Sequence, residues 1–386
     1  MSKRIAILGS TGSIGCNAIE VVQHLGPPYR ITALSAHARC EQLLEQAKTV
    51  RPVAVAVTGV CERDGVGEQF HHLGAEAHFG QTGLVALAEH EEVDIVLNAV
   101  VGAAGLPASV AAVRAGKTLL LANKESLVIA GNLLMPEAKR AGVKILPIDS
   151  EHSAIFQAAL AGRRSEIKRV ILTASGGPFR TWPVDQIQTA SPADALKHPT
   201  WSMGNKITID SATMFNKAAE IIEAVWLFGL DPSQIQVVIH PESIVHSMVE
   251  FTDGSVIAQL SPPDMKTPIQ YALTYPDRAA GCGETMNWLR PFALNFEPPD
   301  PQRFPALEVA FDVAHRGGTL GAVMNAANEV AVAAFLSNRI PFGGICPLVQ
   351  STIARHTVVP EPTLADLLGA DHWARQMAGA GVEDAD

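Results

Sequence analysis

The chain has no excess of positive charge, since 29 lysines and arginines stand against 39 aspartates and glutamates and leave a net charge of -10. Proteins that bind nucleic acids in general do so through clustered lysine and arginine side chains. We therefore expect no nucleic-acid partner. Any anionic ligand must be held by a few local positive groups.

Cysteine is scarce as well. The five cysteines, Cys16, Cys40, Cys61, Cys282 and Cys346, are scattered, odd in number and without a CxxC spacing. Such a pattern argues against a cysteine-based metal site and is typical of proteins in a reducing compartment.

Long apolar runs are also missing. The apolar run Ile5–Leu8 near the N-terminus is too short for the core of a secretory signal. The uncharged stretch Ile95–Val113 is interrupted by Asn98, Gly102 and Pro107, so we expect a strand, a loop and a helix there rather than a membrane span. We expect a cytoplasmic protein without a membrane partner.

The composition does provide enough apolar residues for sizeable cores. Hydrophobic residues make up 47% and charged residues 18% of the 386 residues, which is the composition of a folded globular protein. A domain usually spans about 100 to 200 residues, so two or three domains are expected.

Up to residue 149, short β-branched runs alternate with segments long enough for crossover helices. This α/β alternation predicts a doubly wound parallel sheet, and therefore an N-terminal Rossmann-type domain over residues 1–149. The expected strands are Ile5–Leu8, Ile31–Leu34, Ala54–Val57, Ile95–Asn98, Thr118–Leu121 and Ile145–Ile148.

Beyond this half we expect a central α/β catalytic domain over residues 150–275, with a helix that begins near Asp210. Its expected strands are Val170–Thr173, Gln236–Ile239 and Val256–Leu260, while Val245–Phe251 fits either a strand or the end of a helix. Residues 276–305, rich in proline and glycine, are typical of a linker. A C-terminal helical domain over residues 306–386 is predicted from the segments Leu307–Ala314, Leu320–Leu336, Ile345–Arg355 and Thr363–Met377.

A glycine-rich loop follows the first strand and opens the first helix. Glycines permit a tight turn and close approach of the backbone, and the N–H groups of a helix start face a pyrophosphate. The spacing is GxxGxxG, and a purely structural turn is the alternative to a dinucleotide site. The predicted cofactor contacts are Gly9, Thr11, Gly12, Ser13, Ile14 and Gly15.

The end of the second strand favours NADP over NAD. An acidic residue there normally holds the ribose hydroxyls of NAD, but the segment after this strand carries His37 and Arg39 and no acid before Glu41. We expect Arg39, with His37, to contact the ribose 2′-phosphate. The alternative is that Arg39 only caps a solvated helix.

Two carboxylates, Asp149 and Glu151, follow the last strand of the first domain, at the end where ligands of such sheets bind. On extended backbone they would point the same way and could hold one hard cation. Farther along, Asn216, Lys217 and Glu220 share one face of a predicted helix, with Asp210 or Ser211 as its cap. A simple ion pair between Lys217 and Glu220 is the alternative there.

Three further segments are candidates for the same site. Ser175, followed by two glycines, suits a phosphate. The polar and aromatic loop from His198 to Gly204, which includes Trp201, Ser202 and Met203, suits a lid, and we expect a flexible flap over residues 195–205. The segment that contains Asn123, Lys124 and Glu125 ends a strand where the nicotinamide should reach.

Taken together, these motifs resemble those of the 1-deoxy-D-xylulose 5-phosphate reductoisomerase family, in the family's order and over roughly residues 3–340. They are GSTGSIG at Gly9–Gly15, GAAGL at Gly102–Leu106, LLANKESLV at Leu120–Val128, PIDSEHSAIFQ at Pro147–Gln157, ASGGPFR at Ala174–Arg180, HPTWSMG at His198–Gly204, KITIDSATMFNKAAE at Lys206–Glu220 and NAANE at Asn325–Glu329.

The resemblance implies a role for each matching residue. Asp149, Glu151 and Glu220 match ligands of Mg²⁺ or Mn²⁺, and Ser150 and Lys124 match contacts to the reacting hydroxyls. Groups around the substrate phosphate are matched by Ser175, His198, Ser211, Asn216 and Lys217, and the flap by Trp201 and Met203. Two places depart from the usual form of the family, namely Ala218-Ala219 on the helix and His37-Ala38-Arg39 after the second strand.

The activity implied is the NADPH-dependent rearrangement and reduction of 1-deoxy-D-xylulose 5-phosphate to 2-C-methyl-D-erythritol 4-phosphate, a step of isoprenoid precursor synthesis. The divalent cation would act as a Lewis acid, and a homodimer is expected from the family. Two other classes stay open from the residues alone: a metal-independent NADP dehydrogenase of a small phosphorylated substrate, and a nucleotide-sensing regulator. We expect His240, His246 and the NAANE segment to be structural.

Overall fold

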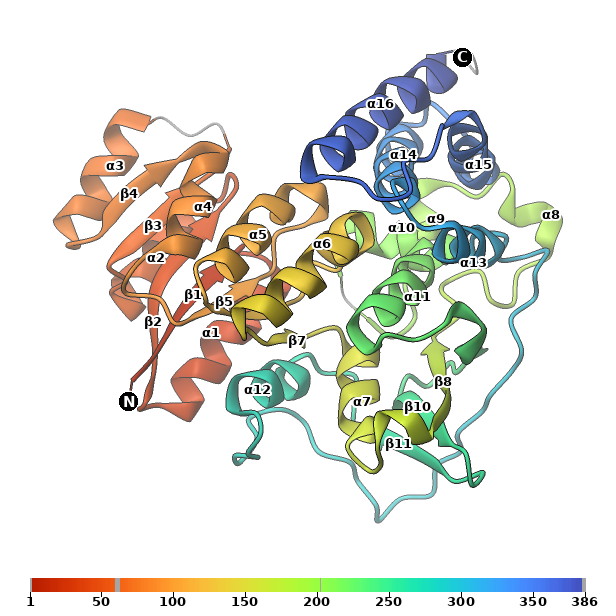
Figure 1. Cartoon of the computed structure of the whole chain (residues 1–386), viewed down its shortest axis with the longest axis horizontal. Coiled ribbons are helices and arrows are strands. Elements are labelled where there is room, and N and C mark those ends of the chain that lie inside the picture. The colour runs from red at the N-terminus through yellow and green to blue at the C-terminus, as the bar shows by residue number, and fades with distance from the viewer. Residues whose placement is uncertain (1, 60–62, 202, 384–386) are drawn as a thin grey trace. The chain divides into compact units, whose positions relative to one another are not determined.

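The computed structural model of the protein describes residues 2–59, 63–201 and 203–383. It divides into two compact units, which we describe one at a time (Figure 1). The first unit comprises residues 1–126, 134–153 and 264–284, and the second comprises residues 127–133, 154–263 and 285–386. Two helices, α6 (Glu125–Ala141) and α7 (Ser150–Ala159), contribute residues to both.

The first unit is built on a parallel sheet of seven strands in the order β4-β3-β2-β1-β5-β6-β7, which confirms the predicted Rossmann-type sheet. The strands are β1 (Lys3–Leu8), β2 (Tyr29–Ala36), β3 (Ala54–Val57), β4 (Glu76–Phe79), β5 (Ile95–Asn98), β6 (Thr118–Leu121) and β7 (Ile145–Pro147). Their order reverses between β1 and β5, and ligands of such sheets bind at the carboxyl ends of the strands beside this point.

Strand β4 was missed by the sequence prediction. Its sequence Glu-Ala-His-Phe has no β-branched residue, and as an edge strand it pairs only with β3. An edge strand needs no continuous apolar run, because one of its sides is not covered by another strand. Its pairing, and not its composition, makes it a strand.

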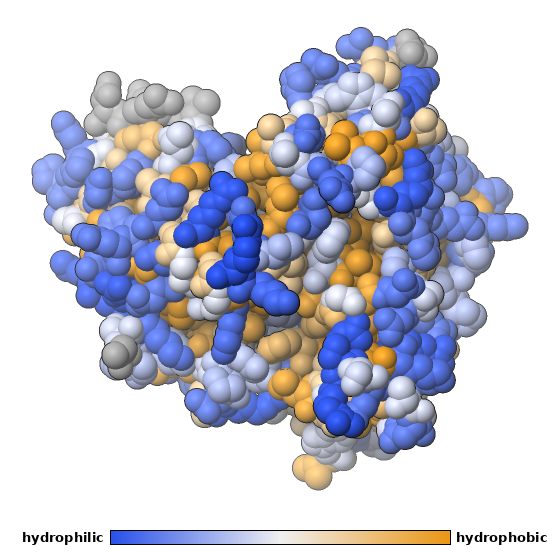
Figure 2. All heavy atoms as spheres, in the orientation of Figure 1, coloured by the Kyte–Doolittle hydropathy of each residue, from blue (hydrophilic) through white to orange (hydrophobic). Residues whose placement is uncertain are grey.

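Helices cover both faces of this sheet (Figure 1). They are α1 (Ser13–Leu25), α2 (Cys40–Val50), α3 (Arg63–His72), α4 (Gly80–Glu89), the short η1 (Gly102–Gly105), α5 (Leu106–Arg114) and α12 (Lys266–Thr274). Their outer sides in this unit are largely hydrophilic on the face shown in Figure 2, while the central strand residues Ile5–Leu8 are fully buried.

The second unit contains a mixed sheet in the order β11-β10-β8-β9. Its strands are β8 (Ile167–Ala174), β9 (Ile235–Ile239), β10 (Val245–Phe251) and β11 (Val256–Leu260), with β8 parallel to β9 and β10 antiparallel to both of its neighbours. The segment Val245–Phe251, which the sequence left open, is therefore a strand.

The helices of this unit are arranged around the sheet and in a C-terminal group. They are η2 (Arg164–Glu166), α8 (Val184–Ile187), α9 (Pro192–Ala195), α10 (Asn205–Thr213), α11 (Phe215–Phe228), η3 (Pro232–Gln234), α13 (Ala306–Arg316), α14 (Leu320–Leu336), η4 (Phe342–Gly344), α15 (Ile345–Arg355) and α16 (Leu364–Glu383). All four predicted C-terminal helices are present.

The predicted start of a helix near Asp210 is wrong. Two helices occupy this region, α10 and α11, and they are separated by Met214, whose φ of 67° is left-handed. Asp210 consequently lies inside α10 and does not cap a helix. A single helical pattern in sequence cannot show such a break, because Met214 carries none of the usual signals of a left-handed residue.

The interrupted stretch after residue 94 forms β5, η1 and α5, as expected, and none of the described helices combines the length and apolarity of a membrane span. Cys16, Cys282 and Cys346 are free thiols, whereas Cys40 is disulfide-bonded. Cys61 lies outside the described residues.

Candidate active site

The glycine loop after β1 owes its shape to two close backbone approaches. Gly9 has a φ of +81°, and a Cβ there would lie 2.7 Å from the carbonyl oxygen of Ala99. A Cβ at Gly15 would lie 2.3 Å from the carbonyl oxygen of Gly9. At Gly12, by contrast, a Cβ would meet only the Gly9 oxygen at 3.4 Å among the described atoms. The loop is therefore open at Gly12, at the start of α1, where a pyrophosphate could approach.

Side chains from β2 and α2 brace this loop. Ser10 is fully buried, and its hydroxyl donates to Gln46 at 2.7 Å while the Gln46 amide donates back to the Ser10 carbonyl at 2.9 Å. The hydroxyl of Ser35 accepts the N–H of Gly9 at 2.9 Å. Sequence reasoning missed Gln46, since a glutamine on a partly exposed helix carries no motif.

The two predicted NADP-specificity residues are exposed, but both are already bonded. A guanidinium nitrogen of Arg39 donates to the carbonyl of Thr11 at 2.8 Å, and Nδ1 of His37 lies 2.9 Å from the hydroxyl of Thr58. Arg39 precedes α2, yet its side chain extends to the loop instead of capping that helix. The Arg39 side chain therefore does not cap α2. Its bond to Thr11 shows that it supports the glycine loop, whether or not it also contacts a cofactor.

Asn123 is buried, and its side chain forms hydrogen bonds with backbone groups of the first unit. Its amide donates to the carbonyl oxygens of Val100 and Gly102 at 2.6 and 2.8 Å, and its own oxygen accepts the N–H of Ser126. Asn123 thus holds the loop after β5 against the start of α6. Glu125, the first residue of α6, lies 3.1 Å from the Asn123 amide.

A charged cluster surrounds Asp149 at the carboxyl end of β7. The Lys124 ammonium forms an ion pair with one carboxylate oxygen, and Nδ1 of the buried His152 lies 3.2 Å from the other. Burial by itself raises the pKa of Asp149, but the nearby Lys124 charge and the His152 contact outweigh it and hold this pKa well below its usual range. Asp149 is therefore ionised at neutral pH.

The extended backbone that we expected between Asp149 and Glu151 is wrong, although the two carboxylates do converge, with oxygens within 4.8 Å of each other. Glu151 lies in the first turn of α7 and not on extended backbone. The Asp149 carboxylate accepts the Glu151 N–H at 3.3 Å, and the N–H of Ser153 donates to the Asp149 carbonyl at 2.8 Å. Asp149 thus starts the helix in the manner of an N-cap. The Ser150 hydroxyl donates to the Glu151 carboxylate.

In the second unit, helix α11 gathers an amide, an ammonium and a carboxylate on one face, as predicted. The Asn216 amide donates to Glu220 at 2.6 Å, and the Lys217 ammonium forms an ion pair with the same carboxylate. Glu220 is fully buried and Lys217 nearly so. The simple ion pair of the alternative is present, but it belongs to a three-residue cluster. Buried charges of this kind persist only when they are paired or bind a ligand.

Ser175 and His198 are hydrogen-bonded, although they lie on different loops. His198 Nε2 is 3.0 Å from the Ser175 hydroxyl, while its Nδ1 accepts the backbone N–H groups of Thr200 and Trp201 at 3.2 and 2.9 Å. Because Nδ1 accepts, Nε2 must carry the proton and donate to Ser175. Burial lowers the pKa of His198, which keeps the ring neutral. The Ser175 hydrogen is then free to point at an anion.

The predicted flap has one described contact with the mixed sheet. The ring of the half-buried Trp201 lies 6.3 Å from that of His246 on β10. Gly204 is the N-cap of α10, directly after Met203. Ser202 lies outside the described residues. His246 therefore contacts the flap as well as the Ser261 carbonyl at 3.1 Å, which the structural expectation did not include.

His240 does have the structural role that we expected. Its Nδ1 lies 2.8 Å from the carbonyl of Asn295, and its ring stacks on Phe296. The Glu242 carboxylate also lies 3.1 Å from Nδ1.

Models of one protein family match most of the chain in three parts. The description "1-deoxy-D-xylulose 5-phosphate reductoisomerase" matches residues 5–131, its C-terminal domain matches residues 145–228, and "DXP reductoisomerase C-terminal domain" matches residues 260–377.

Individual relatives agree with this result. A 1-deoxy-D-xylulose 5-phosphate reductoisomerase of Pelotomaculum thermopropionicum is 48% identical over 99% of both chains. The Zymomonas mobilis enzyme, solved with NADPH, superposes with a TM-score of 0.92 at 40% identity, covering 99% of this chain and 100% of that one. A reductoisomerase solved with NADPH, fosmidomycin and magnesium gives a TM-score of 0.92 at 41% identity, over 99% of this chain and 98% of that one. The chain belongs to the 1-deoxy-D-xylulose 5-phosphate reductoisomerase family.

Proposed function

We propose that the chain converts 1-deoxy-D-xylulose 5-phosphate to 2-C-methyl-D-erythritol 4-phosphate with NADPH and a divalent cation, as an oxidoreductase of isoprenoid precursor synthesis. Membership of the whole chain in the family is the observation that carries this proposal. It is a small-molecule reaction, in agreement with the reductoisomerase solved with NADPH, fosmidomycin and magnesium.

Asp149, Glu151 and Glu220 are proposed as the ligands of Mg²⁺ or Mn²⁺. They offer only oxygen donors, which these hard cations prefer, and the ionised Asp149 suits this role. When bound, the cation supplies a Lewis acid that polarises the substrate carbonyl. In its absence Lys124 and Lys217 neutralise Asp149 and Glu220. Lys124 is then proposed to offset negative charge that develops on the substrate oxygens.

The substrate phosphate is proposed to bind in the second unit. The hydroxyl of Ser175, oriented by His198, is one donor, and Ser211, Asn216 and Lys217 are the others. The adjacent Gly176 and Gly177 both have positive φ, and a Cβ at Gly177 would lie 2.9 Å from the carbonyl oxygen of Ser211, so this loop packs directly against another of the proposed donors. Ser150, beside Glu151, is proposed to contact the reacting hydroxyls together with Lys124.

NADPH is proposed to lie on the open glycine loop at Gly12. His37 and Arg39 are proposed to contact its 2′-phosphate, and Asn123, Glu125, Met203 and Gly204 are proposed as further cofactor contacts. The contact of Thr58 with Nδ1 supports the 2′-phosphate role of His37, because it orients the ring and does not use Nε2.

The flap over residues 195–205 is proposed to close on substrate and exclude water, with Trp201 as its cover. Replacing Trp201 by alanine should then reduce turnover while the melting temperature stays close to that of the parent. Truncation of a core tryptophan would instead cost about 3 to 5 kcal/mol of stability. A large drop in melting temperature would show that Trp201 belongs to the core.

A single assay tests the proposed function. Purified protein should oxidise NADPH when 1-deoxy-D-xylulose 5-phosphate and Mg²⁺ or Mn²⁺ are both present, and the product should be the branched alcohol phosphate. Protein treated with EDTA should be inactive until the cation is restored. Full turnover without any metal would favour the metal-independent dehydrogenase, and no NADPH loss with sugar phosphates would favour a regulator.

We also propose a cytoplasmic homodimer. Strand β11 is an edge of the described mixed sheet, and its side chains Val256 and Ile257 are 47% and 40% exposed. Such an apolar edge is suited to pairing with a second copy of the chain. Ile257→Lys should therefore shift sedimentation from dimer to monomer, and unchanged sedimentation would exclude β11 from the interface. Cytoplasmic metabolism regenerates the NADPH that the reaction needs, and cell fractionation would test the location.

The division of labour along the chain is proposed to follow the predicted segments. Residues 1–149 would bind NADPH, and residues 150–275 would carry the metal and substrate site. Residues 276–305 would form a linker between this central domain and a C-terminal helical domain, residues 306–386.

A further inference from the structure

Helix α10 holds a buried carboxylate that the helix itself does not require. Asp210 lies in the second half of α10 and is only 4% exposed. An acidic side chain near the C-terminal end of a helix interacts unfavourably with the helix dipole, and a buried carboxylate without partners is costly. The position of Asp210 is therefore explained by its partners, not by the helix.

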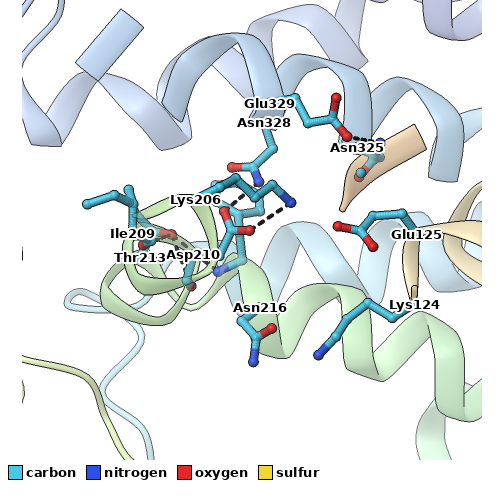
Figure 3. A network of polar contacts seen from close by, with 12 residues as sticks. Lys124, Glu125, Lys206, Ile209, Asp210, Thr213, Asn216, Asn325, Asn328 and Glu329 are labelled. Atoms are coloured by element: carbon cyan, nitrogen blue, oxygen red, sulfur yellow. Dashed lines mark hydrogen bonds and ion pairs between the residues drawn. The ribbon is translucent and has the colours of Figure 1, made fainter. Parts of the chain in front are cut away.

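Two partners hold this carboxylate (Figure 3). The Lys206 ammonium, one turn earlier in α10, lies 2.8 Å from one oxygen. The Asn328 amide of helix α14 donates to the other oxygen, also at 2.8 Å. Asn328 is 5% exposed, and its own oxygen has no hydrogen-bond partner among the described residues. The bond to Asp210 is thus the contact that orients this buried amide, and it ties α10 to α14.

Of the two helices, α14 is the fixed one. It is a long helix that is buried along most of its length, and the residue after Asn328 is bonded to α16, since Glu329 pairs with Arg375 at 2.8 Å. Helix α10 spans only nine residues, and helices of this length are not stable without tertiary contacts. The tie from Asn328 therefore sets the position of α10.

Helix α10 connects two parts of the proposed substrate site. Its N-cap, Gly204, is the exit of the flap, and Ser211, a proposed phosphate donor, directly follows Asp210. We propose that Asn328, acting through Asp210, is a positioning residue that fixes the last turn of α10 so that Ser211 is presented to the substrate phosphate. This inference rests on the proposed role of Ser211.

The test replaces Asn328 by leucine, which keeps the number and branching of the side-chain heavy atoms but removes the donor, with the smaller Asn328→Ala as the substitute if the leucine variant does not fold. We expect KM for 1-deoxy-D-xylulose 5-phosphate to rise about 10-fold, because a small displacement of a binding group is enough for such a loss. We expect kcat to change less than about 3-fold and KM for NADPH to stay unchanged, because the bond to Asn328 acts on the last turn of α10, whereas Gly204, the proposed nicotinamide contact, caps its first turn.

Asn325→Ala is the matched control. Asn325 lies on the same helix and is also 5% exposed, but its amide donates to Glu329 of that helix at 3.0 Å. This variant should keep the parent KM. If Asn325→Ala raises KM as much as Asn328→Leu does, the effect is one of general packing and the inference is wrong. An unchanged KM in folded Asn328→Leu protein would also overturn it.

An exchange of partners sharpens the test. Asp210→Asn should raise KM by itself, and the double variant Asp210→Asn with Asn328→Asp restores a donor and an acceptor with their roles reversed. Recovery of KM in the double variant supports the inference. If KM stays as high as in Asp210→Asn, the effect comes from the lost pair with Lys206, and the tie to Asn328 is not what positions the helix.

Ser211→Ala, measured in parallel, separates this inference from the proposed function. If Ser211→Ala raises KM and Asn328→Leu does not, only the positioning role fails. If Ser211→Ala leaves KM unchanged, the proposed phosphate site itself is wrong.

Discussion

The glycine loop after β1 and the polar face of helix α11 are both proposed to bind ligands, but they are built from different atoms. The loop is shaped by backbone, since glycines at 9 and 15 pack against carbonyl groups that leave no room for a Cβ. The face of α11 is shaped by buried charges, since Asn216 and Lys217 both bond to Glu220. A site made of backbone depends on steric fit, whereas a site made of paired charges depends on every partner being present. The two should therefore fail in different ways when they are mutated.

The largest effect is expected at Glu220. Glu220→Gln keeps the shape of the side chain but removes the charge that Lys217 and a divalent cation need. Turnover should fall by about 100- to 1,000-fold with weaker Mn²⁺ binding, while NADPH affinity stays normal. Steady-state kinetics and metal titration would measure this. Glu250→Gln on β10, where the carboxylate pairs with Lys168 and Arg169, is the control and should remain active. If Glu220→Gln protein keeps its activity, the α11 face does not depend on its paired charges, and the contrast with the glycine loop fails.

Arg39→Ala is expected to have the next largest effect, and on the cofactor alone. A charge-assisted hydrogen bond contributes about 1.5 to 3 kcal/mol, so KM for NADPH should rise roughly 10- to 150-fold. If Arg39 contacts the 2′-phosphate, the weak reaction with NADH should hardly change. If its bond to Thr11 is the important one, both cofactors will be weakened equally. Comparing KM for NADPH and NADH distinguishes the two roles.

Two substitutions in the glycine loop separate binding from stability. A methyl group at Gly12 has ordinary van der Waals room, so Gly12→Ala should raise KM for NADPH about 10-fold without a change in melting temperature. A methyl group at Gly15 would collide with backbone, and Gly15→Ala should also cost about 1 to 3 kcal/mol of unfolding free energy. Thermal unfolding and KM would be measured for both. An unchanged KM in Gly12→Ala would show that this opening is not where the pyrophosphate lies.

The smallest expected effect concerns the protonation of His198. Its folded-state pKa is lowered by burial, so the ring should take up a proton only below the ordinary value near 6.5. The stabilisation that depends on its neutral form is present above that value and is lost as the pH falls through the folded-state pKa. An NMR titration should give a midpoint below 6.5 and a proton on Nε2. A midpoint at or above 6.5 would contradict the orientation assigned to Ser175.

Much of the site could be predicted because its signals are local in sequence. The glycine loop is a continuous segment next to a strand, and the residues of the α11 face follow from helical periodicity alone. The geometry of Glu151 could not be predicted. The three residues from Asp149 to Glu151 fit both an extended backbone and a helix start capped by Asp149, and the structure has the helix start. The left-handed Met214 that separates α10 from α11 escaped for a similar reason.

The sequence by itself determined the Rossmann-type sheet, the glycine loop, the family and the candidate site residues, because each is encoded by neighbouring residues or by a short repeat of apolar positions. Only the tertiary structure decided which distant side chains hold these parts in place. Gln46 braces Ser10 across 36 residues, and Asn328 reaches Asp210 across 118. Such pairs have no sequence signal, since an amide on a helix face is compatible with solvent until folding brings a partner to it and removes the water.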